Sequence, residues 1–106
     1  MIAPFSWLSE PGKYTLSLDA GLLNSDCFAE NNMLGNGYDW EKVASEFMKK
    51  QGIHAEKKFS FDCEADTFSM TSSSKKMLKE FSISFHKFVM DTNAFEEFLR
   101  QLSFCG

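Results

Sequence analysis

The sequence lacks the features that mark a membrane-embedded or disulfide-stabilised protein. It has no apolar run near the roughly 20 residues that cross a bilayer, and its first residues show neither the basic start nor the apolar stretch of a secretory signal. The three cysteines, Cys27, Cys63 and Cys105, are odd in number and widely spaced, which does not indicate a disulfide framework. We therefore expect a soluble cytoplasmic domain with reduced thiols and no membrane partner.

Residues that could form a catalytic or metal site are also few. The two histidines, His54 and His86, lie 32 residues apart, and neither has a cysteine or second histidine at metal-ligand spacing. His86 falls on the polar side of a predicted helix, which favours a solvated histidine. A Cys–His nucleophile pair stays open, although the apolar surroundings of Cys27 and Cys63 favour unreactive thiols. We expect no enzyme: no catalytic residues, no metal and no cofactor.

Signals for phosphate or nucleic-acid binding are missing as well. Residues 35–37 (GNG) lack the lysine and the spacing of a phosphate loop, and Asp39 at the next helix start would repel a phosphate. Glu64 and Asp66 form an acid pair that more simply favours a turn. Lysine pairs are spread over separate elements without interleaved exposed aromatic residues. We therefore expect no nucleic-acid partner.

Aromatic and acidic residues are what the chain has in abundance. Its 106 residues are 43% hydrophobic and include twelve phenylalanines, so one domain spanning 1–106 can bury a dense core. The formal charge of −4 is uneven, because residues 1–48 sum to −5 and residues 49–106 to +1. An acidic half suits a basic protein partner. The alternative is that the surplus acids are ordinary solubilising surface.

Alternation of apolar and polar residues predicts two β-hairpins. Residues 5–8 and 14–18 flank a turn at Pro11-Gly12. Residues 59–61 and 68–71 flank an acidic turn, with their aromatic side chains facing the core. Residues 19–37 are rich in asparagine and glycine, which predicts a long polar loop or, near residues 26–30, a short helical turn.

Helical spacing follows each hairpin. Asp39 is the predicted cap of the first helix, any of the serines at 72–74 can cap the second, and Asn93 with Glu96 resembles a capping box for the third. The predicted fold is therefore α+β, an antiparallel sheet of two hairpins with three helices packed on it, in the order β-β-α-β-β-α-α. The predicted buried stripes are Trp40, Val43, Ala44, Phe47 and Met48, then Met77, Leu78, Phe81, Phe85, Phe88 and Val89, then Phe95, Phe98, Leu99 and Leu102; the predicted wet face of the second helix is Lys75, Lys79, Ser82 and His86.

Four stretches of the chain carry a family pattern. They are residues 4–7 (PFSW), 35–40 (GNGYDW), 61–65 (FDCEA) with Phe68, and the phenylalanine-rich segment 75–89. In this order, over nearly the whole chain, they resemble bacterial polymorphic-toxin immunity protein family 51. The second and third stretches are moderately specific together and weak singly. The chain departs from the pattern at Cys63, where the family has proline, so the turn should be less rigid.

The resemblance implies an antitoxin, a small cytoplasmic protein that binds the C-terminal domain of a cognate toxin and neutralises it. Toxins of such systems are often nucleases with basic clefts, to which an acidic protein would be steered electrostatically. The alternative function is a small cytoplasmic regulatory or adaptor domain without a toxin partner. A monomer is favoured, although an exposed hairpin edge could pair with a second copy.

The residues that would contact the toxin are expected beside the family motif. Trp40, Phe61 and Phe68 are predicted to lie in the core, because toxin-facing surfaces diversify with their partners. The contact residues are then the acids and polar groups of the loop and of the outer face of the first helix: Asp19, Asp26, Glu30, Asn32, Glu41 and Glu46.

Overall fold

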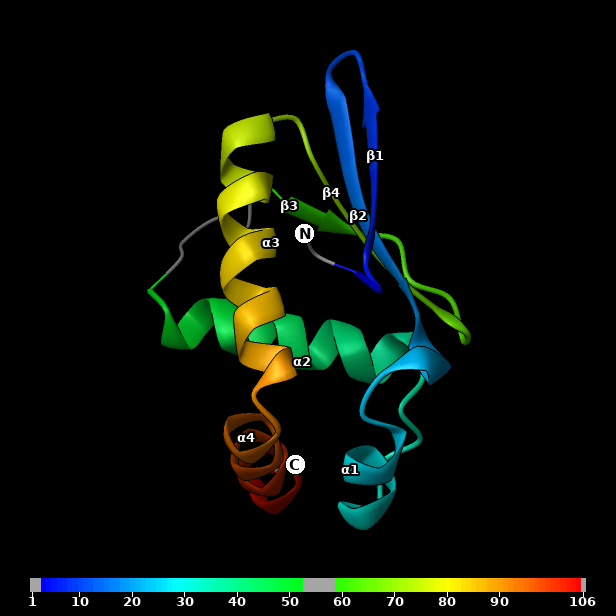
Figure 1. Ribbon diagram of the computed structural model, residues 1–106, viewed down its shortest axis with the longest axis vertical. Helices are drawn as coiled ribbons and strands as arrows, with labels where there is room; N and C mark the ends of the chain where they lie inside the picture. The colour runs from blue at the N-terminus through cyan, green and yellow to red at the C-terminus, as the bar shows by residue number, and fades with distance from the viewer. Residues whose placement is uncertain (1–2, 53–58, 106) are drawn as a thin grey trace.

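Two β-hairpins and a set of helices make up the fold (Figure 1). The computed structural model describes residues 3–52 and 59–105, and over these residues the strands and helices are as follows. The strands are β1 (Ser6–Glu10), β2 (Lys13–Asp19), β3 (Phe59–Phe61) and β4 (Thr67–Ser72); the helices are η1 (Ala20–Leu22, a 3-10 turn), α1 (Ser25–Glu30), α2 (Gly37–Lys50), α3 (Lys75–Met90) and α4 (Thr92–Cys105). The predicted α+β fold and element order are confirmed, with α1 and η1 in addition. No helix within the described ranges is long and apolar enough to span a bilayer.

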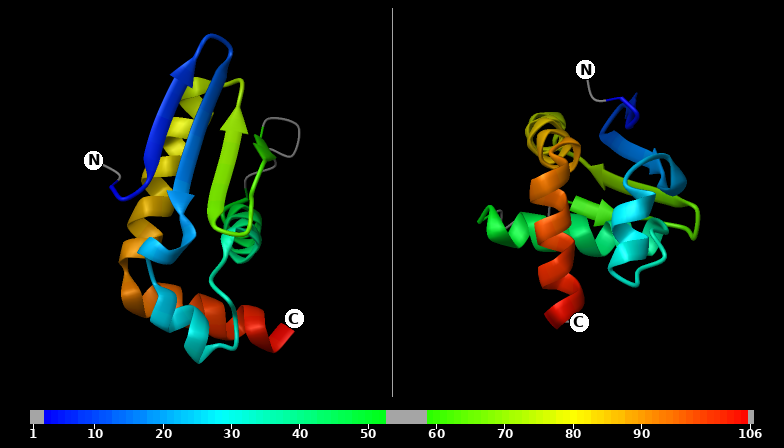
Figure 2. Two further views of the ribbon diagram at one scale, coloured as in Figure 1. Left: turned by 90° about the vertical axis from the view of Figure 1, so that its right-hand side faces the viewer. Right: turned by 60° about the horizontal axis from the view of Figure 1, so that its bottom comes forward.

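The two hairpins join through their inner strands into one antiparallel sheet of order β1-β2-β4-β3. Leu16 on β2 lies opposite Trp7 on one side and Met70 on the other, and Met70 in turn lies opposite Phe61. This row faces α3, which runs along the sheet, while α2 runs across beneath it (Figures 1 and 2). On these two strands the opposite face of the sheet is polar, because the alternate positions are Lys13, Thr15, Ser17 and Asp19 on β2 and Thr67, Ser69 and Thr71 on β4.

Phenylalanine and tryptophan rings fill the space between sheet and helices. The Trp40 side chain is fully buried, with ring contacts to Phe5, Phe28, Phe85 and Phe95 at centroid distances of 5.2–6.4 Å. Its indole nitrogen also donates to the carbonyl oxygen of Ala20 at 3.3 Å. The prediction that Trp40 and Phe68 lie in the core is confirmed, whereas Phe61 on the edge strand is only half-buried.

The start of α2 differs from the prediction. The cap is Asn36, whose side-chain oxygen accepts from the Asp39 amide at 2.8 Å. Asp39 is inside the first turn, and its carboxylate accepts from the Gly35 amide, also at 2.8 Å. The helix thus begins at Gly37, which local propensity disfavours in a helix. Gly37 is needed there because a Cβ would overlap the carbonyl oxygens of Glu64 and Thr67 in the β3–β4 turn.

Two features of α3 refine the prediction. Ser74 is the serine that caps the helix, accepting from the Met77 amide at 3.3 Å. Ser82, predicted on the wet face, is buried instead, and this prediction was wrong because its hydroxyl can donate to the Leu78 carbonyl oxygen one turn earlier, at 2.7 Å. His86 is half-buried, with its Nε2 3.0 Å from the carbonyl oxygen of Ala3.

The predicted cap of α4 was also wrong. The helix begins at Thr92, and Asp91 caps it by accepting from the Ala94 amide at 3.2 Å. Asp91 can do so because it is also the residue that ends α3, where its backbone is extended (φ −89, ψ 95). Asn93 lies exposed inside the first turn. Close to the end of α3, the Asn24 side chain donates to the Val89 carbonyl oxygen at 3.1 Å. This hydrogen bond connects the 19–37 segment to α3.

Candidate partner interface

The predicted contact residues fall into two groups in the structure. Asp19 ends β2, Asp26 and Glu30 lie one turn apart on α1, and Asn32 follows that helix. All four side chains are exposed. These four lie on the segment that connects β2 to α2, which the structure folds into η1 and α1 rather than a long open loop. The remaining two predicted residues are on α2 and are half-buried.

The two α2 residues do not share a face. Glu41 and Glu46 are five positions apart, so they point about 140° away from each other around the helix. Glu41 lies toward Cys63 in the β3–β4 turn, and its charge helps to raise the pKa of the Cys63 thiol. Glu46 instead forms an ion pair with Lys49 at 3.3 Å. The outermost positions of this helix carry Tyr38, Lys42 and Lys49. The structure therefore places Glu41, but not Glu46, toward the β3–β4 turn.

Strand pairing brings together two stretches of the chain that contain no basic residue. Residues 14–41 and residues 59–74 hold eight of the fifteen acids, none of the eleven lysines and arginines, and neither histidine. These stretches include β4 and all of β2 except its first residue, Lys13, and the two strands pair from Tyr14 opposite Ser72 to Asp19 opposite Thr67. An uninterrupted negative potential is expected where their acids gather.

We call this region the acidic corner. It lies where the end of β2, the η1–α1 segment, the start of α2 and the β3–β4 turn meet, on the side that faces the viewer in the left view of Figure 2. Backbone hydrogen bonds join η1 and the start of α2 to the β3–β4 turn: Ala20 donates to the carbonyl oxygen of Asp66 at 2.9 Å, and Gly37 to that of Ala65 at 3.0 Å. The α1 helix follows η1 along the chain and packs against α4. The acids of the acidic corner are Asp19, Asp26, Glu30, Glu41, Asp62, Glu64 and Asp66.

Three acids of this corner are not among the contact residues predicted from the sequence. Asp62, Glu64 and Asp66 belong to the half of the chain with a net charge of +1, and the sequence predicts only a turn for the last two. The turn is confirmed by the Glu64–Thr67 bridge. The local sequence holds no signal that this turn lies against η1 and the start of α2, so only the β2–β4 pairing could have revealed it.

The other end of the molecule has the opposite charge balance. The β1–β2 turn and the first turns of α3 lie away from the acidic corner along the long axis (Figure 1). On α4, the charges of Glu96 and Glu97 are offset by Arg100, whose guanidinium nitrogens lie 3.1 Å and 3.4 Å from the two carboxylates. The charged residues of the far end are Glu10, Lys13, Lys75, Lys76, Lys79 and Glu80.

Cys27 and Cys63 have raised thiol pKa values. Burial, with Glu41 and Asp62 nearby, raises the pKa of the Cys63 thiol to about 11 although a Ser69 backbone hydrogen bond opposes this. Burial and neighbouring acids likewise raise the pKa of Cys27. Both free thiols therefore stay protonated near pH 7 and are poor nucleophiles. His54 lies outside the described residues, and within them no three metal-ligating side chains cluster.

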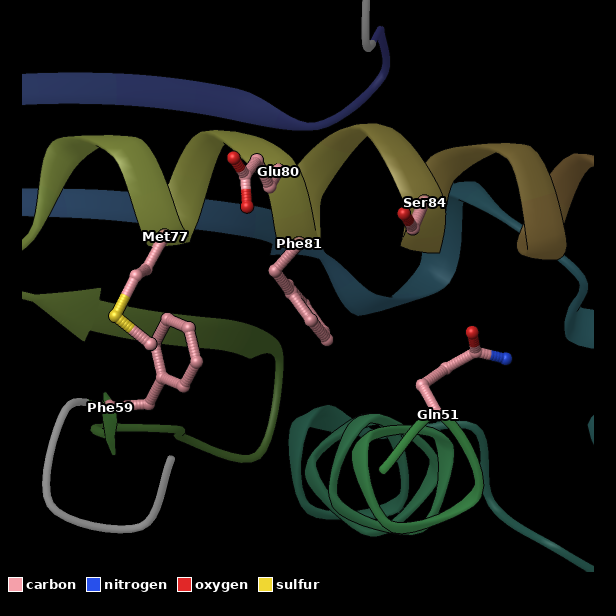
Figure 3. A pocket seen from close by; sticks show the side chains of 6 residues that line it. All are labelled: Gln51, Phe59, Met77, Glu80, Phe81 and Ser84. Atoms are coloured by element: carbon pink, nitrogen blue, oxygen red, sulfur yellow. The ribbon is translucent and has the colours of Figure 1, made fainter. Parts of the chain in front are cut away.

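A pocket of about 310 Å³ lies away from the acidic corner, between the end of α2, β3 and α3 (Figure 3). Phe59, Met77 and Phe81 supply its apolar lining. Among the described residues, its polar lining is Gln51, Glu80 and Ser84, which supply one carboxylate, one amide and one hydroxyl.

Comparison with known proteins agrees with the motif-based resemblance. No curated protein and no solved structure gives a significant match to this chain. A family model does match, over residues 5–103, and its description is Immunity protein 51. This range covers every element that builds the acidic corner. The chain therefore belongs to the Immunity protein 51 family.

Proposed function

We propose that this immunity protein is an antitoxin that neutralises the C-terminal domain of one cognate bacterial toxin in the cytoplasm, by protein–protein contact rather than by catalysis. Family membership supports the immunity role. The acidic corner is the observation that carries the rest, because seven carboxylates on segments without a single base form a surface suited to a basic partner.

A nuclease is the toxin class that fits this surface best. A nuclease cleft must attract a phosphate backbone, so it carries lysine and arginine side chains. Carboxylates of the acidic corner can pair with the same cations, as charge-assisted hydrogen bonds to arginine do elsewhere. Occupation of the cleft would then exclude the nucleic acid. The pairing β2–β4 and the Gly37–Ala65 contact hold the carboxylates on a preformed surface, which limits the entropy lost on binding.

Neutralisation in cells tests this function directly. Cells that express the C-terminal toxin domain encoded by the gene immediately upstream are expected to survive when this protein is co-expressed, and to die with an unrelated immunity protein. Survival should be specific, so toxin domains from other systems should remain lethal. Continued killing by the cognate domain, with the protein soluble and folded in the same cells, would favour the regulatory or adaptor alternative.

Charge reversal in the acidic corner is expected to slow complex formation. The triple variant Asp19→Lys, Glu30→Lys and Glu64→Lys should associate with the toxin domain about 10-fold more slowly or worse at low salt, because it removes the steering potential. The difference should shrink as salt is added. Stopped-flow or surface plasmon resonance measures the association rate constant.

A control with the same change in net charge isolates the position of the charges. The matched triple variant Glu10→Lys, Glu80→Lys and Glu97→Lys reverses exposed acids that lie outside the acidic corner. It should associate at close to the wild-type rate. Equal slowing by both triple variants would mean that net charge alone matters, and the acidic corner would lose its assigned role.

A further inference from the structure

Large apolar side chains are unevenly exposed on this protein. Within the described ranges, six of them are 51–87% exposed: Leu8, Leu22, Leu34, Tyr38, Ile83 and Met90. Leu8 is on β1, and Ile83 and Met90 are on α3, where single exposed apolar residues need no special explanation. The other three, Leu22, Leu34 and Tyr38, all belong to the segments that meet at the acidic corner.

Leu34 is the most exposed of the six, at 87%, and it sits on a loop with fixed geometry. On one side, Met33 donates its amide to the Phe28 carbonyl oxygen at 2.8 Å. On the other side, Gly35 donates to the Asp39 carboxylate and packs against the Phe28 ring, with a φ of +71 that suits glycine. The side chain of Leu34 is therefore presented to solvent by a backbone that is bonded on both sides.

Leu22 and Tyr38 are presented in a similar way. Leu22 is the last residue of η1, and the first residue of η1, Ala20, makes two hydrogen bonds. The Ala20 amide donates to the Asp66 carbonyl oxygen, and the Ala20 carbonyl oxygen accepts from the Trp40 indole. Tyr38 follows Gly37, which is bonded to the Ala65 carbonyl oxygen and fits closely against the β3–β4 turn. All three apolar side chains thus stand on backbone that is locked to the fold, on the same segments as the acids Asp19 and Glu41.

We propose that Leu22, Leu34 and Tyr38 form an apolar anchor, surrounded by the carboxylates of the acidic corner, that docks into an apolar recess rimmed by lysine and arginine on the toxin domain. This inference rests on the proposed function and names the part of the surface that holds the complex together. An apolar centre with a charged rim is the usual anatomy of a protein interface, and tyrosine is among the residues enriched at its energetic centre.

The charge around the anchor determines its occupant. A second copy of this chain would bring seven carboxylates against seven, and like charges across an interface oppose association. An anionic membrane surface is disfavoured for the same reason. A protein with basic residues around an apolar recess gains both apolar burial and charge pairing, so it is the occupant that fits.

The anchor and the acids affect different rate constants. Long-range attraction by carboxylates acts before contact and sets the association rate, whereas short-range apolar packing acts after contact and sets the dissociation rate. Substitution of the anchor by alanine is therefore expected to leave the association rate nearly unchanged and to speed dissociation. Leu34→Ala alone should raise the dissociation rate constant about 10-fold, and the triple alanine variant about 100-fold or more.

The experiment measures both rate constants for wild type, Leu34→Ala, and the triple variant Leu22→Ala, Leu34→Ala and Tyr38→Ala, with the toxin domain as the immobilised partner. The matched control is the triple variant Leu8→Ala, Ile83→Ala and Met90→Ala, whose side chains are also more than half exposed but lie elsewhere. The dissociation rate constant of the control variant should be within about 3-fold of the wild-type value. Circular dichroism melts establish that each variant is folded. Because the Leu34 side chain packs little against the protein, Leu34→Ala is expected to stay folded and to test the anchor even if a triple variant is unstable.

The outcomes separate this inference from the proposed function. Wild-type binding with equal dissociation rates for the anchor and control variants would overturn the anchor while leaving the antitoxin role in place. Absence of wild-type binding would overturn both. A wild-type dimer that the anchor variants convert to a monomer, at the same concentration, would assign the apolar surface to self-association and would also overturn the proposal.

Discussion

Replacement of Gly37 by alanine is expected to destabilise the protein by about 3 kcal/mol or more. The added methyl group would overlap the carbonyl oxygens of Glu64 and Thr67, which are backbone atoms of a hydrogen-bonded turn. A flexible side chain could rotate away, but these atoms can move only if the β3–β4 turn separates from α2. The hydrogen bond from Gly37 to Ala65 would be lost with that movement. Urea unfolding, followed by circular dichroism, measures the change.

Two other glycines provide the comparison. Gly21→Ala should be nearly neutral, because a Cβ added there would point into open space and the φ of Gly21 is not positive. Gly35→Ala should cost about 1–2 kcal/mol, because φ is +71 and the Phe28 side chain would lie 3.2 Å from the added Cβ. A ranking in which Gly37→Ala is no worse than Gly21→Ala would show that the turn and the helix start do not pack as described.

Truncation of Trp40 to alanine should cost about 3–5 kcal/mol. The side chain is fully buried and touches four phenylalanine rings from four different parts of the chain. Its loss also leaves the Ala20 carbonyl oxygen without the indole donor that joins η1 to α2. Domains of this size are stable by about 5–15 kcal/mol, so the variant is expected to be partly unfolded at about 37 °C. Thermal melts by circular dichroism and urea titration measure the loss in the free energy of unfolding.

Phe61 supplies the control for this prediction. It belongs to the same family pattern but is half-buried on the edge strand β3, so Phe61→Ala should cost clearly less than Trp40→Ala. Trp40→Phe should be intermediate, because it keeps most of the apolar contact but loses the bond to Ala20. Equal losses for Trp40→Ala and Phe61→Ala would contradict the central position of Trp40 in the core.

Local sequence was a reliable guide wherever local interactions decide the structure. The two hairpins and the buried stripe of α2 follow from residue alternation and helical spacing, and both are confirmed. Helix starts were less predictable. Asn36, rather than Asp39, caps α2 because Gly37 enters the helix, and the reason for that glycine is a contact with Glu64, 27 residues further along the chain. Asp91 caps α4 because it also ends α3, which spacing alone does not reveal.

The acids of the candidate interface likewise include some that local sequence predicts and others that only the structure reveals. The acids of the 19–37 segment are predicted contacts, and the structure places Asp19, Asp26 and Glu30 exposed on connected segments. Sequence proximity groups Glu46 with them, but helix geometry turns it away and pairs it with Lys49. Asp62, Glu64 and Asp66 belong to a different half of the charge distribution, and they are the acids that complete the corner.

The α+β class, the apolar stripes and the family pattern follow from the amino-acid sequence alone, because they depend on the order and spacing of neighbouring residues. The place where the negative charge gathers depends on the tertiary structure. Electrostatic potential depends on distance through space, and the antiparallel pairing of β2 with β4 brings residues 14–41 and 59–74 together. That pairing turned two separate base-free stretches into one acidic corner around exposed apolar side chains.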